Sequence, residues 1–247
     1  EVKLDPKTGR LIRDGVPSII NPDDKNALEE ALRIKDENPD TTVTVVSMGP
    51  PQADVAMREA LAMGADEAIL ISGREFGGSD TWATSYIIAT AIKKIPDYDI
   101  IFCGRQAIDG DTAQVGPQIA EQLNIPQITY VQKLDIEGDK VIVQRQLEDG
   151  YTVVEAKMPV LLTAIKELNT PRYMTPKGIF EAYNKTVQVW GFNDVPVDAE
   201  KIGLKGSPTN VNRTFSPEAK GKGIMLEGAD KETVKTLIAK LDEKHLL

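Results

Sequence analysis

The sequence predicts an open α/β fold: a mostly parallel, doubly wound sheet with antiparallel edge strands and a C-terminal arm that ends in a helix. Two patterns support this fold class. Short apolar runs alternate with helix-like segments through the first half of the chain, as they do in parallel sheets covered on both faces. Beyond residue 127, strand-like segments follow one another with only turns between them, which indicates antiparallel pairing.

The helices of the first half carry ordinary start signals. Asn21 is suited to cap a helix over 21–38, Pro22 suits its first position, and the acidic residues that follow complement its positive end. The same reasoning predicts further helices and the buried strands between them. The expected strands are 43–47, 68–71 and 100–103, and the other expected helices are 51–63, 81–94 and 113–123.

The sequence pattern changes twice in the second half of the chain. Four strand-like segments are expected to extend one edge of the sheet with antiparallel pairs. They are 128–135, 140–147, 151–157 and 159–164. Residues 184–228 are irregular and rich in Gly, Pro, Asn and Lys, and the helix expected at 229–243 has one apolar face. We therefore divide the chain into an α/β domain, 1–183, and a C-terminal arm, 184–247, that is expected to pack on a partner.

The start of the chain departs from the fold that the rest predicts. Its first residues alternate apolar and polar side chains around a turn at 5–9, which indicates a hairpin. A doubly wound sheet usually begins with a buried parallel strand instead. We expect that a native N-terminal strand is absent from this sequence.

Composition narrows the chemistry that the chain can perform. Its net charge is −9, and no basic cluster outweighs the acidic excess, so a nucleic acid is not an expected partner. One Cys and one His exclude a disulfide framework, a thiolate metal site and a His-based triad within the sequence. No apolar run could span a membrane and no signal peptide is recognisable, so we expect a cytoplasmic protein whose redox chemistry, if any, comes from a bound cofactor.

The main functional signal is a loop between an expected strand and an expected helix, CGRQAIDGDTAQVGP at 103–117. Asp111 has capping-box spacing to the glutamine three residues further on, so we expect it to cap the helix. Gly104 and Gly110 permit unusual backbone conformations, and Gly116 permits close packing. Backbone N–H groups at the start of a helix bind anions, so this loop suits a pyrophosphate.

Three other turns should lie at the same edge of the sheet, because the carboxyl ends of parallel strands meet there. These turns are 21–24, 47–50 and 78–81. Together with the loop they could wall a nucleotide, although the loop is neither a GxGxxG fingerprint nor a Walker loop. The residues alone leave two interpretations open: a nucleotide site, or ordinary capped turns between strands and helices.

The segment GRQAIDGDTAQVG, 104–116, closely resembles the adenine-nucleotide loop of electron transfer flavoprotein β subunits. Other segments resemble the same family in the same order, and the likeness covers about residues 2–190. They are RDGV at 13–16 with NP at 21–22, SMGP at 47–50, ALAMGAD at 60–66, PVLLTA at 159–164 and LNTPRY at 168–173. Two features depart from the family: Thr152 replaces a usual acidic or amide residue, and an N-terminal strand with its Lys-x-Val-Pro-Asp turn is missing.

The resemblance implies a fold of the adenine-nucleotide hydrolase type and a heterodimer with a larger α subunit that carries FAD. Ordinary members hold AMP in the β subunit, whereas electron-bifurcating members hold a second FAD that accepts hydride from NADH. The segment GSDTWATS, 78–85, resembles the bifurcating group, and Thr81, Thr84 and Ser85 would supply hydroxyl groups to the flavin. The implied function is to oxidise NADH and divide its electrons between an acyl-CoA dehydrogenase and a ferredoxin or flavodoxin.

The resemblance also assigns site residues. The expected cofactor-binding residues are Asn21, Asp23, Met48, Gly49, Thr81, Thr84, Cys103, Gly104, Arg105, Gln106, Asp109, Gly110, Asp111, Thr112, Gln114, Val115 and Gly116. Leu168 lies in the segment that resembles the family's partner-recognition loop, and it would insert into a pocket on the dehydrogenase. We assign no catalytic residue and no metal ligand.

Two rival functions stay open. The chain could serve a simple electron carrier that holds AMP as a structural ligand, or it could be a nucleotide-binding module without a redox role. Some residues also have a plainer interpretation: Cys103 as a small core residue, Trp82 as a packing residue and Arg105 as a surface charge.

Overall fold

The computed structural model describes residues 18–212, 221 and 223–247. The described residues up to Asn210 form one compact unit, and those from Val211 onward belong to a second. The hairpin expected at the start of the chain lies outside the described residues.

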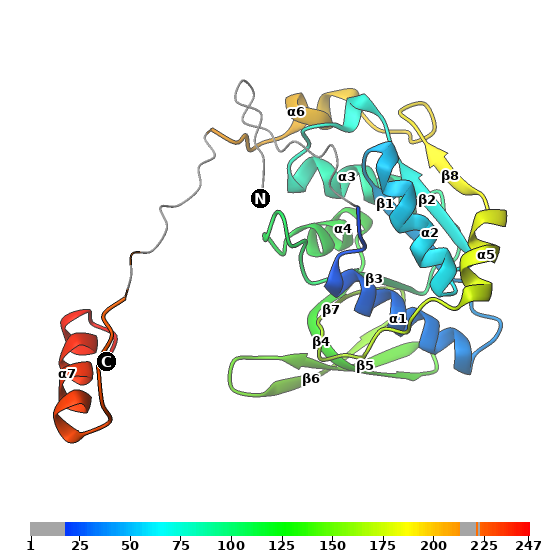
Figure 1. Ribbon diagram of the computed structural model, residues 1–247. Coiled ribbons are helices and arrows are strands. Elements are labelled where there is room, and N and C mark those ends of the chain that lie inside the picture. Colours follow the sequence, from blue (N-terminus) through cyan, green and yellow to red (C-terminus); the bar gives the residue numbers. More distant parts are fainter. Residues whose placement is uncertain (1–17, 213–220, 222) are drawn as a thin grey trace. The chain divides into compact units, whose positions relative to one another are not determined.

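Helices and strands alternate as far as Leu123, and four consecutive strands follow before the next helix (Figure 1). The helices are α1 (Pro22–Glu37), α2 (Asp54–Met63), α3 (Thr81–Ile92), α4 (Val115–Leu123), α5 (Pro176–Asn184) and α6 (Gly203–Gly206). The strands are β1 (Thr44–Met48), β2 (Glu67–Ile71), β3 (Ile100–Gly104), β4 (Gln127–Glu137), β5 (Lys140–Gln146), β6 (Tyr151–Lys157), β7 (Val160–Ala164) and β8 (Val187–Trp190). Each helix and strand expected in the first half is present, with ends that differ by a few residues at most.

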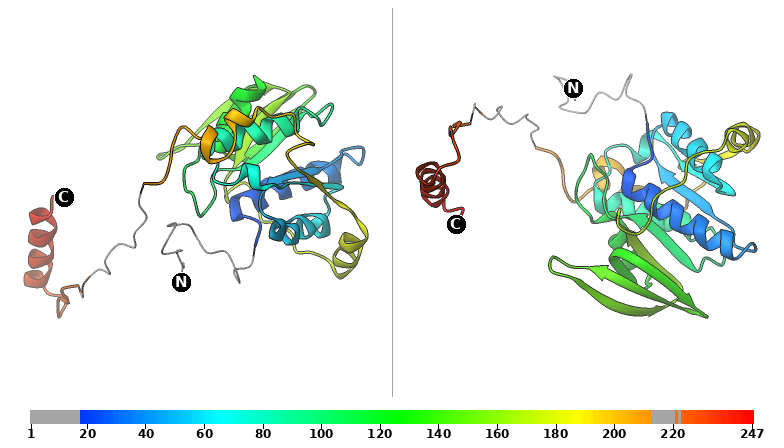
Figure 2. Two further views of the ribbon diagram at one scale, coloured as in Figure 1. Left: turned by 90° about the horizontal axis from the view of Figure 1, so that it is seen from above. Right: turned by 60° about the horizontal axis from the view of Figure 1, so that its bottom comes forward.

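The strands form two sheets. The first is entirely parallel, in the order β1-β2-β8, with Ala68 opposite Val45 and Val187. The second has the order β3-β7-β4-β5-β6: β7 is parallel to β3 and β4, whereas β5 and β6 continue as antiparallel strands. Figure 2 shows these antiparallel strands reaching beyond the helices. The predicted class, an open and mostly parallel α/β fold with antiparallel edge strands, is confirmed.

One strand has a different place from the one predicted. Residues 159–164, expected among the antiparallel additions, instead contain β7, which lies between β3 and β4. All five residues of β7 are buried, and Leu161 pairs with Ile101 on one side and Gln127 on the other. That prediction is wrong because strand partners are set by contacts far apart in the sequence, which a short apolar run does not reveal.

Part of the expected arm belongs to the compact unit. β8 pairs in parallel with β2, although it follows the expected end of the domain at residue 183. Val195 and Ile202, further along the chain, are buried in a cluster with Phe76. The compact unit therefore continues to Asn210.

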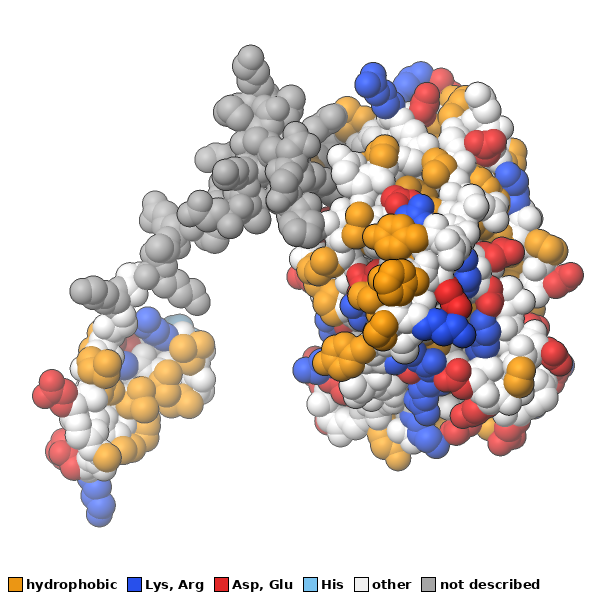
Figure 3. Space-filling view, turned by 45° about the vertical axis from the view of Figure 1, so that its right-hand side comes forward, with side chains coloured by type: hydrophobic (Ala, Val, Ile, Leu, Met, Phe, Trp, Pro, Cys, Tyr) orange, Lys and Arg blue, Asp and Glu red, His pale blue; other side chains and the backbone are white. Residues whose placement is uncertain are grey.

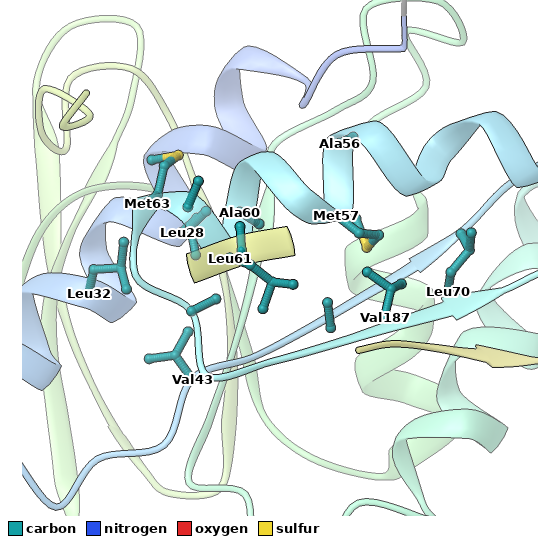
Figure 4. Close-up of a cluster of buried hydrophobic side chains, with 14 residues drawn as sticks. Leu28, Leu32, Val43, Ala56, Met57, Ala60, Leu61, Met63, Leu70 and Val187 are labelled. Atoms are coloured by element: carbon teal, nitrogen blue, oxygen red, sulfur yellow. The ribbon is translucent and has the colours of Figure 1, made fainter. Parts of the chain in front are cut away.

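Helices cover both faces of the sheets. Successive side chains of a strand point to opposite faces, so apolar side chains on each face need a covering layer. On one face of the first sheet, Leu28 of α1, Leu61 of α2 and Leu70 of β2 are buried together (Figure 4). On the other face, Ile87 of α3 packs with Ile71. In the second sheet, α1 and α4 pack against β3 and β7 from opposite sides.

The second unit contains α7 (Lys231–Glu243). Asp230 caps this helix, since its side chain accepts a hydrogen bond of 2.8 Å from the amide of Thr233. The apolar stripe of α7 is about half exposed and consists of Val234, Leu237 and Ile238. None of the helices in the described part of the chain has the length and apolar character needed to cross a membrane.

Candidate nucleotide site

The start of α1 is tied to the loop that follows β3. The side-chain nitrogen of Asn21 donates to the carbonyl oxygen of Gln106 at 2.9 Å, and its side-chain oxygen accepts from the amide of Ile108 at 3.1 Å. The prediction that Asn21 caps α1 is wrong, because this side chain makes no capping hydrogen bond to the helix. Asn21 organises the loop instead of its own helix.

Asp24, in the first turn of α1, takes part in the same contact. Its Oδ1 accepts from the amide of Gly104 at 2.6 Å, and its Oδ2 accepts from Asn21 Nδ2 at 2.9 Å. A Cβ at position 104 would lie 2.6 Å from the Asp24 backbone nitrogen, so glycine permits this approach. Asp24 is exposed as a residue, but the protein around its carboxyl group desolvates that group and raises the pKa of Asp24, although the Gly104 hydrogen bond opposes this shift.

Asp23 and Arg105 form an ion pair beside this contact. Arg105 Nε lies 3.3 Å from Asp23 Oδ2, although the two groups lack the alignment of a hydrogen bond. Both side chains line a polar cavity of about 280 Å³ with Gln146, Ile165, Lys166 and Glu167, so Arg105 lies at a recess of the surface and beside an acidic partner. A larger cavity of about 340 Å³ lies between the end of α2 and the start of α5, and none of the expected cofactor-binding residues lines it.

The middle of the loop is a tight turn. The Asp111 amide donates to the carbonyl of Ala107 at 2.9 Å, and Asp111 has a φ of 53°, in the left-handed region. Its carboxylate accepts from Gln106 Nε2, so it closes the turn. The prediction that Asp111 caps α4 is therefore wrong, since the helix begins further along the chain. Asp109 and Gly110 lie at the exposed tip, and a Cβ at position 110 would have no neighbour within 4 Å.

The loop ends at the start of α4, which no side chain of the described residues caps. Gln114 occupies the N-cap position, and its Oε1 accepts from Thr81 Oγ1 of α3 at 3.1 Å. The first amides of a helix have no partner within it, so this end offers N–H groups and positive potential. Thr112 is exposed ahead of the helix, whereas Val115 and Gly116 face the core, where a Cβ on Gly116 would come within 3.1 Å of a β7 side chain.

Asp80 caps α3 and also holds a distant segment. Its Oδ1 accepts from the amide of Ala83 at 3.0 Å, and its Oδ2 accepts from the amide and the hydroxyl of Thr209 at 2.9 and 2.8 Å. Burial opposes ionisation of this carboxyl, but the hydrogen bonds outweigh burial and lower the pKa of Asp80. Ser85, expected to contact a ligand, is fully buried and donates to the carbonyl of Trp82. That prediction is wrong.

The remaining expected residues lie at the ends of β1 and β3 and in α3. Met48 packs against α3, and the amide of Gly49 donates to the last carbonyl of β2. Thr84 is partly buried in the first turn of α3. Cys103 packs against α4, and burial raises the pKa of Cys103 to about 12, so its side chain stays a thiol.

Most of the expected residues thus come to one edge of the fold. The Asn21 and Asp24 hydrogen bonds join α1 to the loop, and the bond between Thr81 and Gln114 joins α3 to α4. This edge presents amides, hydroxyls and the Arg105 cation, which are groups that bind phosphates and sugars. Within the described residues, no cluster of three or more His, Cys, Asp or Glu could hold a metal ion.

Leu168 is not exposed, contrary to prediction. Only 8% of its surface is accessible, and its side chain packs in the core of the second sheet. The segment around it is clamped to α1: Arg172 Nε and Nη2 donate to Glu29 at 2.9 and 3.1 Å, and Asn169 and Asn26 exchange hydrogen bonds. Leu168 therefore offers almost no exposed surface to a partner.

Sequence reasoning missed the residues that hold these loops. Asp24, Asp80 and Arg172 each bond to a segment far along the chain, which no local pattern reveals. The one local signal for these contacts was the segment NPDD at 21–24, in which carboxylates follow an amide. The same segment is equally typical of an ordinary helix start, so it did not identify the contacts.

Comparison with known proteins assigns the family. The family described as "Electron transfer flavoprotein domain" matches residues 8–195 of this chain. The chain belongs to the electron transfer flavoprotein family. One electron transfer flavoprotein relative, the "Electron transfer flavoprotein subunit beta" of Thermoanaerobacterium thermosaccharolyticum, is 61% identical over 248 residues, an alignment that covers 100% of this chain and 95% of the relative.

Two further relatives in the electron transfer flavoprotein family carry names that mention a reductase. The "Caffeyl-CoA reductase-Etf complex subunit CarD" of Acetobacterium woodii is 58% identical and aligns over 100% of this chain and 95% of the relative. The "Acryloyl-CoA reductase electron transfer subunit gamma" of Anaerotignum propionicum is 53% identical, with 97% and 92% covered. The predicted resemblance to the electron transfer flavoprotein β subunit is confirmed, and a β subunit implies an α subunit as its partner.

Proposed function

We propose that this chain is the β subunit of an electron-bifurcating electron transfer flavoprotein. The heterodimer binds FAD at the candidate site, oxidises NADH there, and sends one electron through the α-subunit FAD to an acyl-CoA dehydrogenase and the other to a ferredoxin or flavodoxin. When bound, FAD supplies hydride uptake and single-electron release. The observation that carries the proposal is the uncapped start of α4, which stands beside the hydroxyl of Thr81.

The residues at this edge fit the parts of such a cofactor. The amides at the start of α4 suit its pyrophosphate. Thr81 and Thr84 lie in the first turn of α3 and provide hydroxyls for a ribityl chain. The Arg105 guanidinium at the end of β3 adds a positive charge, which favours a reduced, anionic flavin over its neutral form.

A simple electron carrier with structural AMP is the alternative. Both nucleotides fit the start of α4, because both carry phosphate. A flavin adds a ribityl chain and a ring to the AMP footprint, and the two threonines of α3 give those added groups a partner. A nucleotide-binding module without a redox role is disfavoured by the family match.

The nucleotide content of the co-expressed heterodimer tests the proposal. The complex would be denatured, and released FAD and AMP would be counted per heterodimer. Two FAD and no AMP, together with bleaching of the flavin by NADH, is the expected result. One FAD and one AMP would overturn bifurcation and leave the chain as the scaffold of a simple carrier.

The contact with the dehydrogenase falls, in this proposal, on the exposed apolar surface of Tyr173, Phe180 and Tyr183. These residues are 95%, 76% and 72% exposed; Tyr173 ends the clamped segment that resembles the family's recognition loop, and Phe180 and Tyr183 lie in α5 just after it. Figure 3 shows hydrophobic side chains along this face, flanked by Lys and Arg. Exposed apolar patches of this kind mark protein interfaces, and this one replaces the insertion expected of Leu168.

Steady-state electron transfer tests this contact. Phe180→Ser should raise the KM for the dehydrogenase several-fold while flavin content and NADH oxidation stay unchanged. Val55→Ser is a matched control, since Val55 on α2 is 64% exposed and lies outside this surface. An unchanged KM for the Phe180 variant would place the contact elsewhere.

A further inference from the structure

α5 carries two of the exposed aromatic side chains proposed to meet the dehydrogenase, yet little of the helix itself is buried. It has nine residues, all of them described, and Ala182 alone among them is buried. Isolated helices shorter than about 12–15 residues are marginal in water, and most helical stability in proteins comes from packing. The position of α5 therefore depends on its contacts with α2, beside which it lies (Figure 1).

The first turn of α5 is held by a cap and by close packing. Thr175 caps the helix, because its hydroxyl oxygen accepts from the amide of Gly178 at 2.9 Å. A Cβ at position 178 would lie 2.3 Å from the carbonyl oxygen of Ala62, so glycine lets α5 approach the end of α2. These contacts fix where α5 begins, but they do not reach its other end, which carries Phe180 and Tyr183.

Most of the polar contacts at that other end come from one guanidinium group, that of Arg58 in α2. Its Nη1 donates to the carbonyl oxygens of Ala182 and Lys185 at 3.1 and 3.5 Å, and its central carbon lies 5.3 Å from the centre of the Tyr183 ring. Lys185 adds a hydrogen bond of 2.7 Å from its Nζ to the carbonyl of Ala65. The last carbonyls of a helix lack partners within it and carry negative potential, so a cation there stabilises the helix end.

The ordinary use of such an arginine does not account for this arrangement. Asp54 lies four residues earlier on α2, and Arg58 Nε donates to its carboxylate at 2.8 Å. An ion pair of this kind within one helix contributes little to stability and occupies only one side of the guanidinium group. Here the pair fixes the direction of the group, and its other side reaches α5. A lysine at this position could not make both sets of contacts, because it carries a single ammonium group.

We propose that Arg58 is a positioning residue that holds α5 so that Phe180 and Tyr183 meet the dehydrogenase in one fixed arrangement, without contacting the dehydrogenase itself. This inference rests on the proposed function, which assigns the dehydrogenase contact to this surface. A surface that is ordered before its partner arrives loses less conformational freedom on binding. If α5 is displaced in part of the molecules, the apparent affinity falls in proportion to the fraction that remains competent.

The test uses the full chain in its heterodimer and the dehydrogenase as electron-transfer partner. Arg58→Lys keeps the positive charge beside Asp54 and removes the contacts with α5. Asp54→Ala is a milder variant, because it keeps the guanidinium group and removes only the carboxylate that orients it. Arg33→Lys is the matched control, since Arg33 pairs with Glu30 inside α1 at 3.1 Å.

Arg58→Lys should raise the KM for the dehydrogenase about tenfold, the usual effect of losing one hydrogen bond made by a charged group. Its kcat, flavin content and NADH oxidation should stay unchanged. Asp54→Ala should raise the same KM by about twofold, as expected for the loss of an exposed ion pair. In the heterodimer without dehydrogenase, hydrogen exchange of the amides at 180–185 should rise about tenfold in Arg58→Lys and stay unchanged in Arg33→Lys.

Three results would overturn the inference. A raised KM with wild-type amide exchange in α5 would mean that Arg58 contacts the dehydrogenase directly. Raised exchange with an unchanged KM would mean that Arg58 only stabilises the fold. Wild-type values of both quantities in Arg58→Lys and Asp54→Ala would mean that α5 does not depend on this contact.

Failure of the proposed function is recognised separately. An unchanged KM in Phe180→Ser rejects the contact surface itself, and the inference with it. AMP in place of the second FAD rejects electron bifurcation alone. The KM and exchange measurements then still decide the role of Arg58, because a simple electron carrier also has to meet its dehydrogenase.

Discussion

Gly104 and Gly110 lie in the same loop but have opposite surroundings, and this contrast makes a prediction at the residue scale. A Cβ at position 104 would meet the α1 backbone at 2.6 Å, whereas one at position 110 would meet nothing within 4 Å. Gly104→Ala should therefore lower the free energy of unfolding by about 1–3 kcal/mol and weaken nucleotide binding. Gly110→Ala should be neutral or stabilising by about 0.5 kcal/mol. Urea denaturation of both variants checks this, and equal losses would contradict it.

Two acidic residues near helix starts show what local pattern can and cannot predict. Asp80 and Asp111 each precede a helix at a distance that suits capping, but only Asp80 caps one. Asp111 adopts a left-handed conformation and closes a turn with Gln106. The sequence predicts that a helix begins here, because that depends on residues within one turn. Which side chain caps it depends on how the loop folds, and that is decided by contacts with α1.

At the scale of elements, Asp80 joins the start of α3 to Thr209, because its carboxylate accepts two hydrogen bonds from that residue. The pKa of Asp80 is lowered in the folded state, so its contribution to stability is present above the unfolded pKa of about 3.9 and is lost as pH falls through the folded value. Asp80→Asn should therefore cost about 1–2 kcal/mol of unfolding free energy at pH 7 and less at pH 3. Urea denaturation at both pH values measures the difference.

The exposed Asp40→Asn variant is a suitable control for that experiment. Its unfolding free energy should follow the wild type at both pH values. If Asp80→Asn shows the same loss at pH 3 as at pH 7, the carboxylate charge does not hold the Thr209 segment.

The clamp between α1 and the segment before α5 makes a second prediction at this scale. Glu29 has a side chain that is 6% exposed, and Arg172 is its bidentate partner. Arg172→Ala should lower the unfolding free energy by about 2–3 kcal/mol, because it leaves a buried carboxylate without its ion-pair partner. Lys177→Ala removes a cation that is 82% exposed and should change stability by less than about 0.5 kcal/mol. If thermal or urea unfolding shows that the two variants lose similar amounts of unfolding free energy, the ion pair between Arg172 and Glu29 does not stabilise the protein as expected.

At the scale of the whole molecule, α7 needs a partner for its half-exposed apolar stripe. We expect that partner to be the α subunit, so Leu237→Ser combined with Ile238→Ser should weaken heterodimer formation at least tenfold. The unfolding free energy of the compact unit should not change, because α7 belongs to the other unit. Isothermal titration measures the affinity, and Lys240→Ala on the same helix is the control. If the double variant binds the α subunit as tightly as the wild type, the apolar stripe of α7 contacts another partner.

The order of elements in the first half could be predicted from the sequence, whereas the assembly of the second half could not. Apolar runs such as 68–71 identify buried strands because both faces of a parallel strand are covered. The same kind of run at 160–164 does not reveal that β7 sits between β3 and β4. Likewise, residues 187–190 form a strand because β2 offers an open edge, and nothing within those four residues predicts that.

The pairing of β8 with β2 has a consequence for how the chain folds while it is being synthesised. A ribosome releases β1 and β2 early, but the strand that covers the other edge of β2 emerges only after residues 72–186 have been synthesised. Through that interval the nascent chain carries an open strand of sequence AILI, a template for pairing with a neighbouring chain. Translation that stalls before Trp190 therefore leaves a product prone to aggregation, and chaperones that shield nascent chains matter most over this stretch.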